Sequence, residues 1–240
     1  RARSGERLGP AARSDCMHPY PAFLEISGKR CLVVGAGRVG LRKISGLLDS
    51  GPEIMVLDPA PPSPEVRGLV ETGAVKYEQR EFEPSDLEGV SLAFAATSNR
   101  EANREIASAC RLRGVPVNVA DDRQASDFLV PAAYTNHGVT LAVGTGGISP
   151  ALARRIRIDL QDRLDKRYGH LLALMEILRP MIIDLGRDSD ENARVFRELV
   201  SSPLMDALYE NKPHKARKYL ANILPRELHP RIEELIDASI

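Results

Sequence analysis

Three glycines with the spacing G-x-G-x-x-G stand near the start of the sequence, at Gly35, Gly37 and Gly40. They follow the apolar run "RCLVV" (30–34) and open a segment with helical spacing of its apolar residues. In that context the first glycine permits a tight turn, the second lets the backbone approach a pyrophosphate, and the third lets the helix pack closely on the strand. The first N–H groups of the helix then face the phosphates. The pattern predicts a dinucleotide site; the alternative is a purely structural turn.

A single carboxylate, Asp58, ends the second apolar segment, "EIMVLD" (53–58). A carboxylate at the end of this strand accepts hydrogen bonds from the hydroxyl groups of a ribose and repels a 2′-phosphate. Asp58 therefore favours NAD over NADP as the cofactor. The alternative is that it is only a turn residue before Pro59.

Two more carboxylates, Asp121 and Asp122, follow the fifth apolar segment, in "NVADD" (118–122). In an open parallel sheet the carboxyl ends of the strands form the ligand crevice, and "AATSNREAN" (95–103) leaves the sheet at the same edge. A carboxylate there can take a proton while a hydride leaves to a nicotinamide ring. The alternative, that both aspartates are capping or turn residues, fits their position equally well.

A second glycine-rich stretch, "VGTGGISPALARRIR" (143–157), combines several features that suit an anion. Its glycines let the backbone come close to a ligand, and Ser149 marks the start of a helix with free N–H groups. Arginines follow at once, and together these groups suit a ligand with several carboxylates. The alternative is a turn before an ordinary helix with solvated arginines. The residues of this stretch that we expect to bind substrate are Thr145, Gly146, Gly147, Ser149, Arg154 and Arg155.

Alternating strands and helices are needed to bring these residues together. The sequence predicts parallel strands at 30–34, 53–58, 75–82, 90–97 and 115–121. Helices are expected from Val39 to the break at Gly51, over 64–72 and over 100–114. This alternation of nearly continuous apolar strands with helices indicates an α/β fold with a Rossmann-type parallel sheet covered on both faces. One more strand at 138–147 and a helix at 149–164, with Ser149 as N-cap and Pro150 in the first turn, follow it.

The remaining sequence, from 166 to 240, is helical in pattern, with breaks near Gly186, Pro203, Pro213, Pro225 and Pro230. We expect four parts: a disordered extension over 1–16, a Rossmann domain over 17–130, a dimerisation and substrate segment over 131–165, and an all-helical C-terminal domain over 166–240. The helical domain carries no motif with an evident chemistry, so packing or a lid is its expected role.

Charge and cysteine content exclude several classes of protein. Lys+Arg and Asp+Glu both number 33, so no overall field recruits nucleic acid or an anionic membrane. The three cysteines are far apart and form no C-x-x-C pair, which argues against a disulfide framework or zinc site and favours the reducing cytoplasm. Histidines at metal-ligand spacing are absent from the sequence, and so is an apolar run of the ~18 residues that span a membrane. No bound metal is therefore expected.

Four motifs in their order resemble a known family. The segments "CLVVGAGRVGLRK", "AATSNREAN", "VNVADDRQASDFLVPA" and "LAVGTGGISPALARRIR" are similar to the precorrin-2 dehydrogenase / sirohydrochlorin ferrochelatase family, the NAD-dependent module that also forms the N-terminal part of sirohaem synthases. The resemblance covers roughly residues 18–165 and weakens through the helical tail. It implies that precorrin-2, a tetrapyrrole with carboxylate arms, loses a hydride to NAD and becomes sirohydrochlorin. It also implies a homodimer built on the middle segment.

The resemblance also assigns roles to residues. The aspartate of the N-V-x-D position, Asp121 and not Asp122, is the acid/base. Three groups of residues are expected to bind the cofactor. They are the turn and helix start at Gly35, Ala36, Gly37, Arg38, Val39 and Gly40, the adenosine side at Asp58, Pro59 and Ala60, and the nicotinamide side at Ala96, Thr97 and Asn118.

The sequence leaves other readings open. Some members of the family also insert iron or cobalt, which needs a base near the macrocycle, and Asp121 or His137 is a candidate for it. Thr145 stands where one member carries a phosphorylatable serine. Threonine keeps the hydroxyl group, but nothing in the sequence supports regulation there. Two rivals remain. A non-catalytic NAD-binding sensor needs neither Asp121 nor the anion site, and a tetrapyrrole chelatase or carrier without hydride chemistry needs no Asp58.

Overall fold

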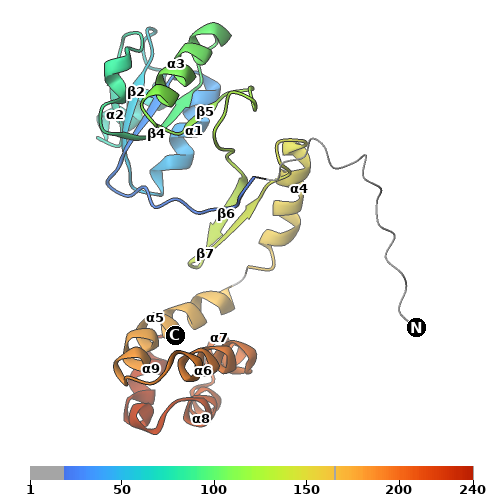
Figure 1. Ribbon diagram of the computed structural model, residues 1–240. Helices are drawn as coiled ribbons and strands as arrows, with labels where there is room; N and C mark the ends of the chain where they lie inside the picture. Colours follow the sequence, from blue (N-terminus) through green and yellow to red (C-terminus); the bar gives the residue numbers. More distant parts are fainter. Residues whose placement is uncertain (1–18, 165, 240) are drawn as a thin grey trace, which may run out of the picture. The chain divides into compact units, whose positions relative to one another are not determined.

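The computed structural model of the chain describes residues 19–164 and 166–239 (Figure 1). Contacts divide it into two compact units. The N-terminal unit reaches Val130 and includes Gly146–Ile148, and the C-terminal unit consists of Pro131–Thr145 and the chain from Ser149 onwards. The extension expected over 1–16 lies outside the described residues, and the four-part division of the chain stays a prediction.

The N-terminal unit is a five-stranded parallel sheet with helices on both faces (Figure 1). Its strand order is β3-β2-β1-β4-β5, the order of the first five strands of a Rossmann fold, and the predicted fold class is confirmed. The strands are β1 Arg30–Val34, β2 Glu53–Leu57, β3 Lys76–Glu78, β4 Val90–Ala95 and β5 Val117–Val119. The connecting helices are α1 Arg38–Leu48, α2 Pro64–Glu71, the short 3₁₀ helix η2 Pro84–Leu87 and α3 Arg100–Leu112.

Both faces of the central strands are buried, which explains their continuous apolar sequence. Along β1, Leu32 and Val34 point to the core that α3 covers with Ile106, whereas Val33 points to the opposite core with Ile44 of α1. Residues of a strand alternate between the faces, so a strand covered on both sides needs apolar residues at every position. Because the strands are parallel, the carboxyl ends of β1, β4 and β5 lie at the same edge of the sheet. Packed cores on both faces of the sheet hold this edge in place.

The edge strand β3 is shorter than the predicted 75–82, because its chain turns away after Glu78. Arg80 donates to both carboxylate oxygens of Asp86, at 2.9 and 2.6 Å, and also pairs with Glu78. These ion pairs hold the segment against η2 and replace the ladder hydrogen bonds that further strand residues would make.

The C-terminal unit begins with a β-hairpin of which the sequence predicted only one strand. Strands β6 Ala132–Asn136 and β7 Val139–Val143 pair antiparallel around a two-residue turn, His137–Gly138. Both turn residues have positive φ, 49° and 78°, as in the type I′ turns that match the twist of a hairpin. His137 is therefore a turn residue. The helix that follows, α4 Pro150–Gln161, starts as predicted, with the Ser149 hydroxyl accepting from Leu152 N.

The rest of the unit is a helical bundle with a leucine-rich core (Figure 1). Breaks occur near Gly186, Pro203, Pro213 and Pro225 as predicted, whereas Pro230 lies inside a 3₁₀ helix. Its elements are α5 Lys166–Asp184, α6 Ser189–Ser201, α7 Leu204–Tyr209, α8 Pro213–Ile223, η3 Arg226–Arg231 and α9 Ile232–Asp237. Leu174, Leu178, Leu199 and Leu220 are fully buried in its core. None of the helices in the described part of the chain is long and apolar enough to cross a membrane.

Candidate functional site

The glycine turn between β1 and α1 admits no side chain at two of its positions. Gly35 has φ +96°, and a Cβ there would lie 2.5 Å from the carbonyl oxygen of Ala96. A Cβ on Gly40 would lie 1.8 Å from the carbonyl oxygen of Gly35. Gly37 differs, because a Cβ there would meet nothing within 4 Å. The first and third glycines are thus required by packing, and open space lies in front of the second.

The start of α1 is left without a side-chain cap. Gly37 is the N-cap, its position offers no side-chain acceptor, and the first turn contains no acidic residue. Gly37 and Arg38 are exposed, and Val39 is half-buried. Free backbone N–H groups at an exposed helix start suit the pyrophosphate of a dinucleotide. The open space at Gly37 and these free donors fit such a cofactor.

Asp58, directly after β2, ties the glycine turn to the strand. Its carboxylate oxygens accept from Ala36 N at 2.6 Å and from Ala60 N at 2.8 Å. The bond to Ala60 is the turn role that the sequence left open, and the bond to Ala36 holds the cofactor turn in place. Tyr77 closes the same corner by donating to Ala60 O at 2.6 Å. Burial, and then the nearby Asp58 carboxylate, raise the pKa of Tyr77, so its hydroxyl stays a donor.

After β4, a buried asparagine that the sequence analysis missed fixes the loop. The Asn103 side chain is 4% exposed; its Oδ1 accepts from Thr97 N at 3.1 Å and from Thr97 Oγ1 at 2.7 Å. Its Nδ2 donates to Thr97 O at 3.1 Å. An asparagine on the apolar face of α3, one turn before Ile106 and Ala107, was the available signal. Asn103 thereby orients Ala96 and Thr97 at the edge where a nicotinamide would lie.

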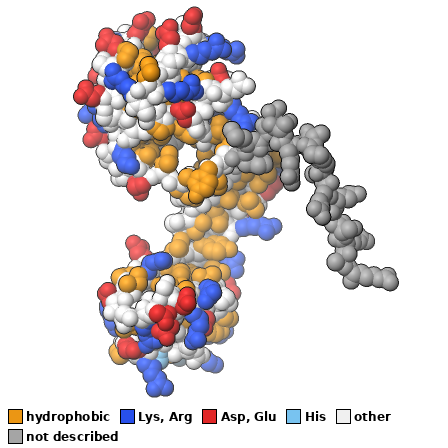
Figure 2. Space-filling view, in the orientation of Figure 1, with side chains coloured by type: hydrophobic (Ala, Val, Ile, Leu, Met, Phe, Trp, Pro, Cys, Tyr) orange, Lys and Arg blue, Asp and Glu red, His pale blue; other side chains and the backbone are white. Residues whose placement is uncertain are grey.

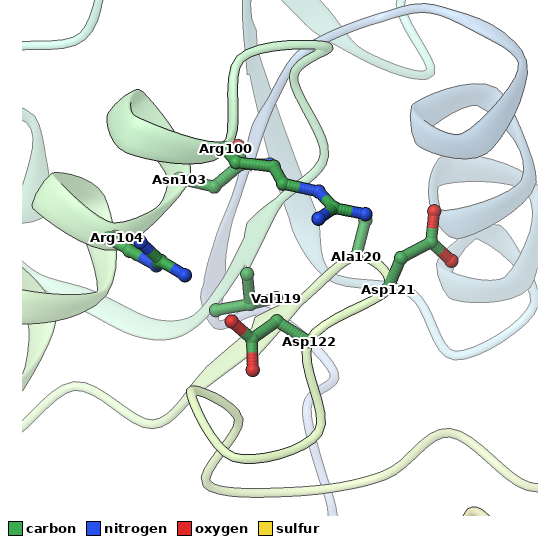
Figure 3. A pocket seen from close by; sticks show the side chains of 7 residues that line it. All are labelled: Arg100, Asn103, Arg104, Val119, Ala120, Asp121 and Asp122. Carbon is green, nitrogen blue, oxygen red and sulfur yellow. The ribbon is translucent and has the colours of Figure 1, made fainter.

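The two aspartates after β5 have different surroundings. Asp122 is a turn residue, since its Oδ1 accepts from Ala125 N at 3.0 Å. Asp121 is exposed, has φ 59°, and its carboxylate has no hydrogen-bond partner among residues 19–164 and 166–239. Figure 3 shows the carboxylates pointing apart, with Asp121 turned toward the blue helix, α1. Asn118, buried just before them, donates to Phe128 O at 2.9 Å and anchors the loop.

Lys43 of α1 is a second residue that the sequence analysis did not single out. Its ammonium group lies 5.7 Å from the centroid of the Phe94 ring on β4. Burial lowers the pKa of Lys43, the neighbouring Arg42 lowers it further, and the Asp121 carboxylate opposes both. The positive charge of Lys43 therefore acts on Asp121, the free carboxylate at this edge.

A small pocket of about 50 Å³ adjoins Asp121 (Figure 3). It lies between the first turns of α3 and the end of β5. Its lining consists of Arg100, Asn103, Arg104, Val119, Ala120, Asp121 and Asp122.

The glycine-rich stretch before α4 forms a self-contained turn. The Thr145 hydroxyl accepts from Ser149 N at 3.1 Å and donates to Ser149 O at 3.0 Å. Gly146 and Gly147 have positive φ, 61° and 81°, and belong to the N-terminal unit, whereas Thr145 and Ser149 belong to the C-terminal unit. The two flanking residues hold each other, so their side chains have a structural role whether or not they contact a ligand.

The arginines of α4 lie on an exposed surface of the C-terminal unit. Arg155 pairs with Asp159 one turn on, at 2.9 Å, with 74% of its side chain exposed. Arg154 is exposed and forms no ion pair with any described residue. The solvated-helix alternative thus describes Arg155. Groups of three or more His, Cys, Asp or Glu side chains that could hold a metal ion are absent from the residues that the structure describes.

Comparison with known proteins identifies similar chains. Residues 22–132 match a family model described as "Putative NAD(P)-binding". The siroheme synthase of Chromobacterium violaceum is 35% identical over 201 residues, which are 84% of this chain and 43% of that protein. The siroheme synthase of Thioalkalivibrio sulfidiphilus is 32% identical over 212 residues, 88% of this chain and 43% of that protein. The chain thus spans less than half the length of the curated relatives it matches.

Among solved structures, SirC, a precorrin-2 dehydrogenase, superposes with a TM-score of 0.65 at 25% sequence identity, covering 85% of this chain and 98% of that one. The resemblance stated from the sequence motifs is confirmed by these matches, and so is the prediction of a nicotinamide dinucleotide as cofactor. The roles of the individual site residues stay predictions.

Proposed function

The chain carries the motifs and the fold of the precorrin-2 dehydrogenase family, and from that premise we propose that it oxidises precorrin-2 to sirohydrochlorin with NAD as the hydride acceptor. One observation supports the proposal above the others. An unpaired carboxylate, that of Asp121, lies at the carboxyl edge of the same sheet as the glycine turn. A binding module for NAD alone has no use for that group.

The cofactor end of the site is built from backbone groups. The free N–H groups of α1 and the space at Gly37 hold the pyrophosphate. Asp58 uses one lone pair of each oxygen for Ala36 and Ala60 and keeps others for the ribose hydroxyls. Its negative charge disfavours a 2′-phosphate, so NAD binds in preference to NADP. NAD, when bound, supplies an acceptor for two electrons and a proton in the form of a hydride.

Asp121 takes the second hydrogen. Loss of two hydrogens from precorrin-2 sends one away as hydride and the other as a proton, and the Asp121 carboxylate accepts that proton. The ammonium group of Lys43 supplies a positive charge that interacts with this carboxylate. The loop that carries Asp121 is anchored by Asn118 on one side and by the Asp122 turn on the other.

The middle segment completes the enzyme as a homodimer in our proposal. Against the described residues, helix α4 buries Ala153 alone, and its Leu152 is 51% exposed. Ile158, further along the same helix, is 37% exposed. Figure 2 shows hydrophobic side chains, in orange, on the surface at the β6–β7 hairpin of the same unit. Exposed apolar side chains of this kind are typical of a surface that another subunit covers. The turn over Thr145–Ser149 and the arginines of α4 would then serve the substrate, as the family resemblance implies.

We also propose that the protein inserts a metal ion into the product, with Fe(II) or Co(II) as the substrate ion. Asp121 and His137 are the two candidate bases for it, and His137 lies in the turn of the β6–β7 hairpin. We also propose that the enzyme works in the cytoplasm. The two described cysteines, Cys31 and Cys110, are buried free thiols, which suits a reducing compartment.

The experiment is anaerobic absorbance spectroscopy of the purified protein with precorrin-2 and either NAD or NADP. We expect NADH to appear together with the sirohydrochlorin spectrum, and a slower reaction with NADP. Addition of Fe(II) or Co(II) afterwards, against an enzyme-free control, reports metal insertion separately. NAD binding without NADH formation would favour a sensor, and tetrapyrrole binding without NADH formation would favour a carrier; either result contradicts the proposal.

A further inference from the structure

We propose that the pocket beside Asp121 is a carboxylate-binding subsite, in which Arg100 and Arg104 of α3 hold one carboxylate arm of the tetrapyrrole. The inference rests on the proposed function and adds the residues that orient the substrate over the base. Carboxylate binding was expected from the arginines of α4, and the pocket adds a pair of arginines on α3.

The first support is the position of the two guanidinium groups. Arg100 and Arg104 are one helical turn apart, so they share a face of α3. Figure 3 shows both side chains reaching from α3 toward the end of β5, where Asp121 lies. Both line the same pocket as Asp121. A group held by them is thereby placed beside the loop that carries the proposed base.

The second support is the absence of counter-ions within the described residues. Arg100 and Arg104 form no ion pair or side-chain hydrogen bond with any residue of 19–164 or 166–239. Neither arginine forms an ion pair with the neighbouring carboxylates, which are those of Glu101, Glu105, Asp121 and Asp122. Like charges at i and i+4 destabilise a helix slightly. The exposed arginines elsewhere are often paired, as Arg155 is with Asp159, so this pair is available for a ligand.

The third support is the size and chemistry of the space. About 50 Å³ exceeds the volume of about 10–15 Å³ that a single water needs by this kind of measure, so a carboxylate fits. Guanidinium groups bind carboxylates through two parallel hydrogen bonds, which fixes orientation as well as position. The buried Asn103 amide, locked by Thr97, forms a rigid wall.

The test compares Arg100→Gln, Arg104→Gln and the double variant with wild type in the anaerobic assay. Because the guanidinium groups are exposed, we expect each single change to raise KM for precorrin-2 about fivefold and the double change about 20-fold, with kcat and the Kd for NAD within about twofold of wild type. Arg100→Lys should recover part of the loss. Arg113→Gln is the matched control, since it removes the same charge from the end of α3, outside the pocket, and should leave KM unchanged.

A binding measurement keeps the inference testable without turnover. The Kd for sirohydrochlorin is measured by its fluorescence, and uroporphyrin and coproporphyrin, with eight and four carboxylates, are compared as stable probes. We expect the wild type to bind uroporphyrin more tightly than coproporphyrin. The double variant should bind sirohydrochlorin more weakly and should bind the two porphyrins with similar affinity. Unchanged KM and Kd in an active double variant would overturn the subsite and leave the proposed function intact. A wild type that binds NAD but never forms NADH would overturn the proposed function, and the porphyrin titrations would still decide on the arginines.

Discussion

The N-terminal unit and the α5–α9 bundle have cores of the same kind, but their polar groups serve different ends. In the first, Asp58, Asn103 and Asn118 use their side chains to hold loops at one edge of the sheet, around the free carboxylate of Asp121. In the bundle, Arg187 and Glu227 form a surface ion pair between helix ends. Both regions bury leucines completely, so stability alone does not distinguish them. We therefore expect that substitutions in the α5–α9 bundle change stability without changing cofactor binding, and that substitutions at the edge of the sheet change cofactor binding.

Shortening a core side chain of the bundle should give the largest loss of stability without touching the cofactor site. Leu174 of α5 is fully buried, and Leu174→Ala should lower the free energy of unfolding of the bundle by about 2–5 kcal/mol. Urea unfolding followed by circular dichroism measures this. The Kd for NAD, from calorimetry, should stay that of wild type. A marked weakening of NAD binding would contradict the separation of the two regions.

A single methyl group at the glycine turn should affect mainly the binding of NAD, with a smaller loss of stability. Gly40→Ala places a Cβ 1.8 Å from Gly35 O, and the backbone shift that this forces should cost about 1–3 kcal/mol of stability and remove measurable NAD binding. Gly46→Ala, on the same helix with nothing within 4 Å of its Cβ, is the matched control. It should stabilise the protein by about 0.5–1 kcal/mol and keep its affinity for NAD. Equal NAD affinity of the two variants would refute the packing argument for Gly40.

The ion pair at the edge of the sheet should have a smaller effect that depends on pH. The hydrogen bonds from Arg80 hold the pKa of Asp86 below its ordinary value of 3.8. A carboxyl group whose pKa is lower in the folded state stabilises the fold above the unfolded value, and this stabilisation disappears as the pH falls through the folded value. Asp86→Asn should therefore cost about 1 kcal/mol at pH 7, because the Asp86 side chain is only 12% exposed, and progressively less below pH 4.

A matched pair on the exposed face of α4 gives the lower limit for such effects. Asp159→Asn removes the partner of Arg155, and both side chains are more than half exposed, so the loss at pH 7 should be about 0.3 kcal/mol. Urea titrations at several pH values compare the two variants. A cost for Asp86→Asn that stays constant down to pH 2 would show that the charge of Asp86 is not its source.

Local rules made much of this structure predictable. The glycine turn and the Ser149–Pro150 helix start depend on neighbours in the sequence, so their residue types alone specify them. Strand β6 was missed because its own sequence gives little indication of a strand. "AAYTN" lacks a long apolar run, and its partner becomes visible only when the His137–Gly138 turn is recognised, with a histidine in the left-handed region.

The candidate site was predictable in its backbone and less so in its side chains. Gly35 and Asp58 lie where the strand and helix pattern puts them. Lys43 was missed because its importance arises from its place over Phe94 and its interaction with Asp121, which are distant in the sequence. Asn103 was missed because its hydrogen bonds to Thr97 become visible only when the β4–α3 turn is folded. The division of labour between Asp121 and Asp122 also needed the structure, since only the fold shows which carboxylate is used in a turn.

The most direct measurement of the central claim is the initial rate of the Asp121→Asn variant with precorrin-2 and NAD under anaerobic conditions, next to its Kd for NAD. Asparagine keeps the shape of the side chain and cannot take the proton. We expect the rate to fall at least about 100-fold while the Kd for NAD stays within about twofold of wild type. A rate close to that of wild type would show that the free carboxylate at the end of β5 is not the base, and would contradict the account.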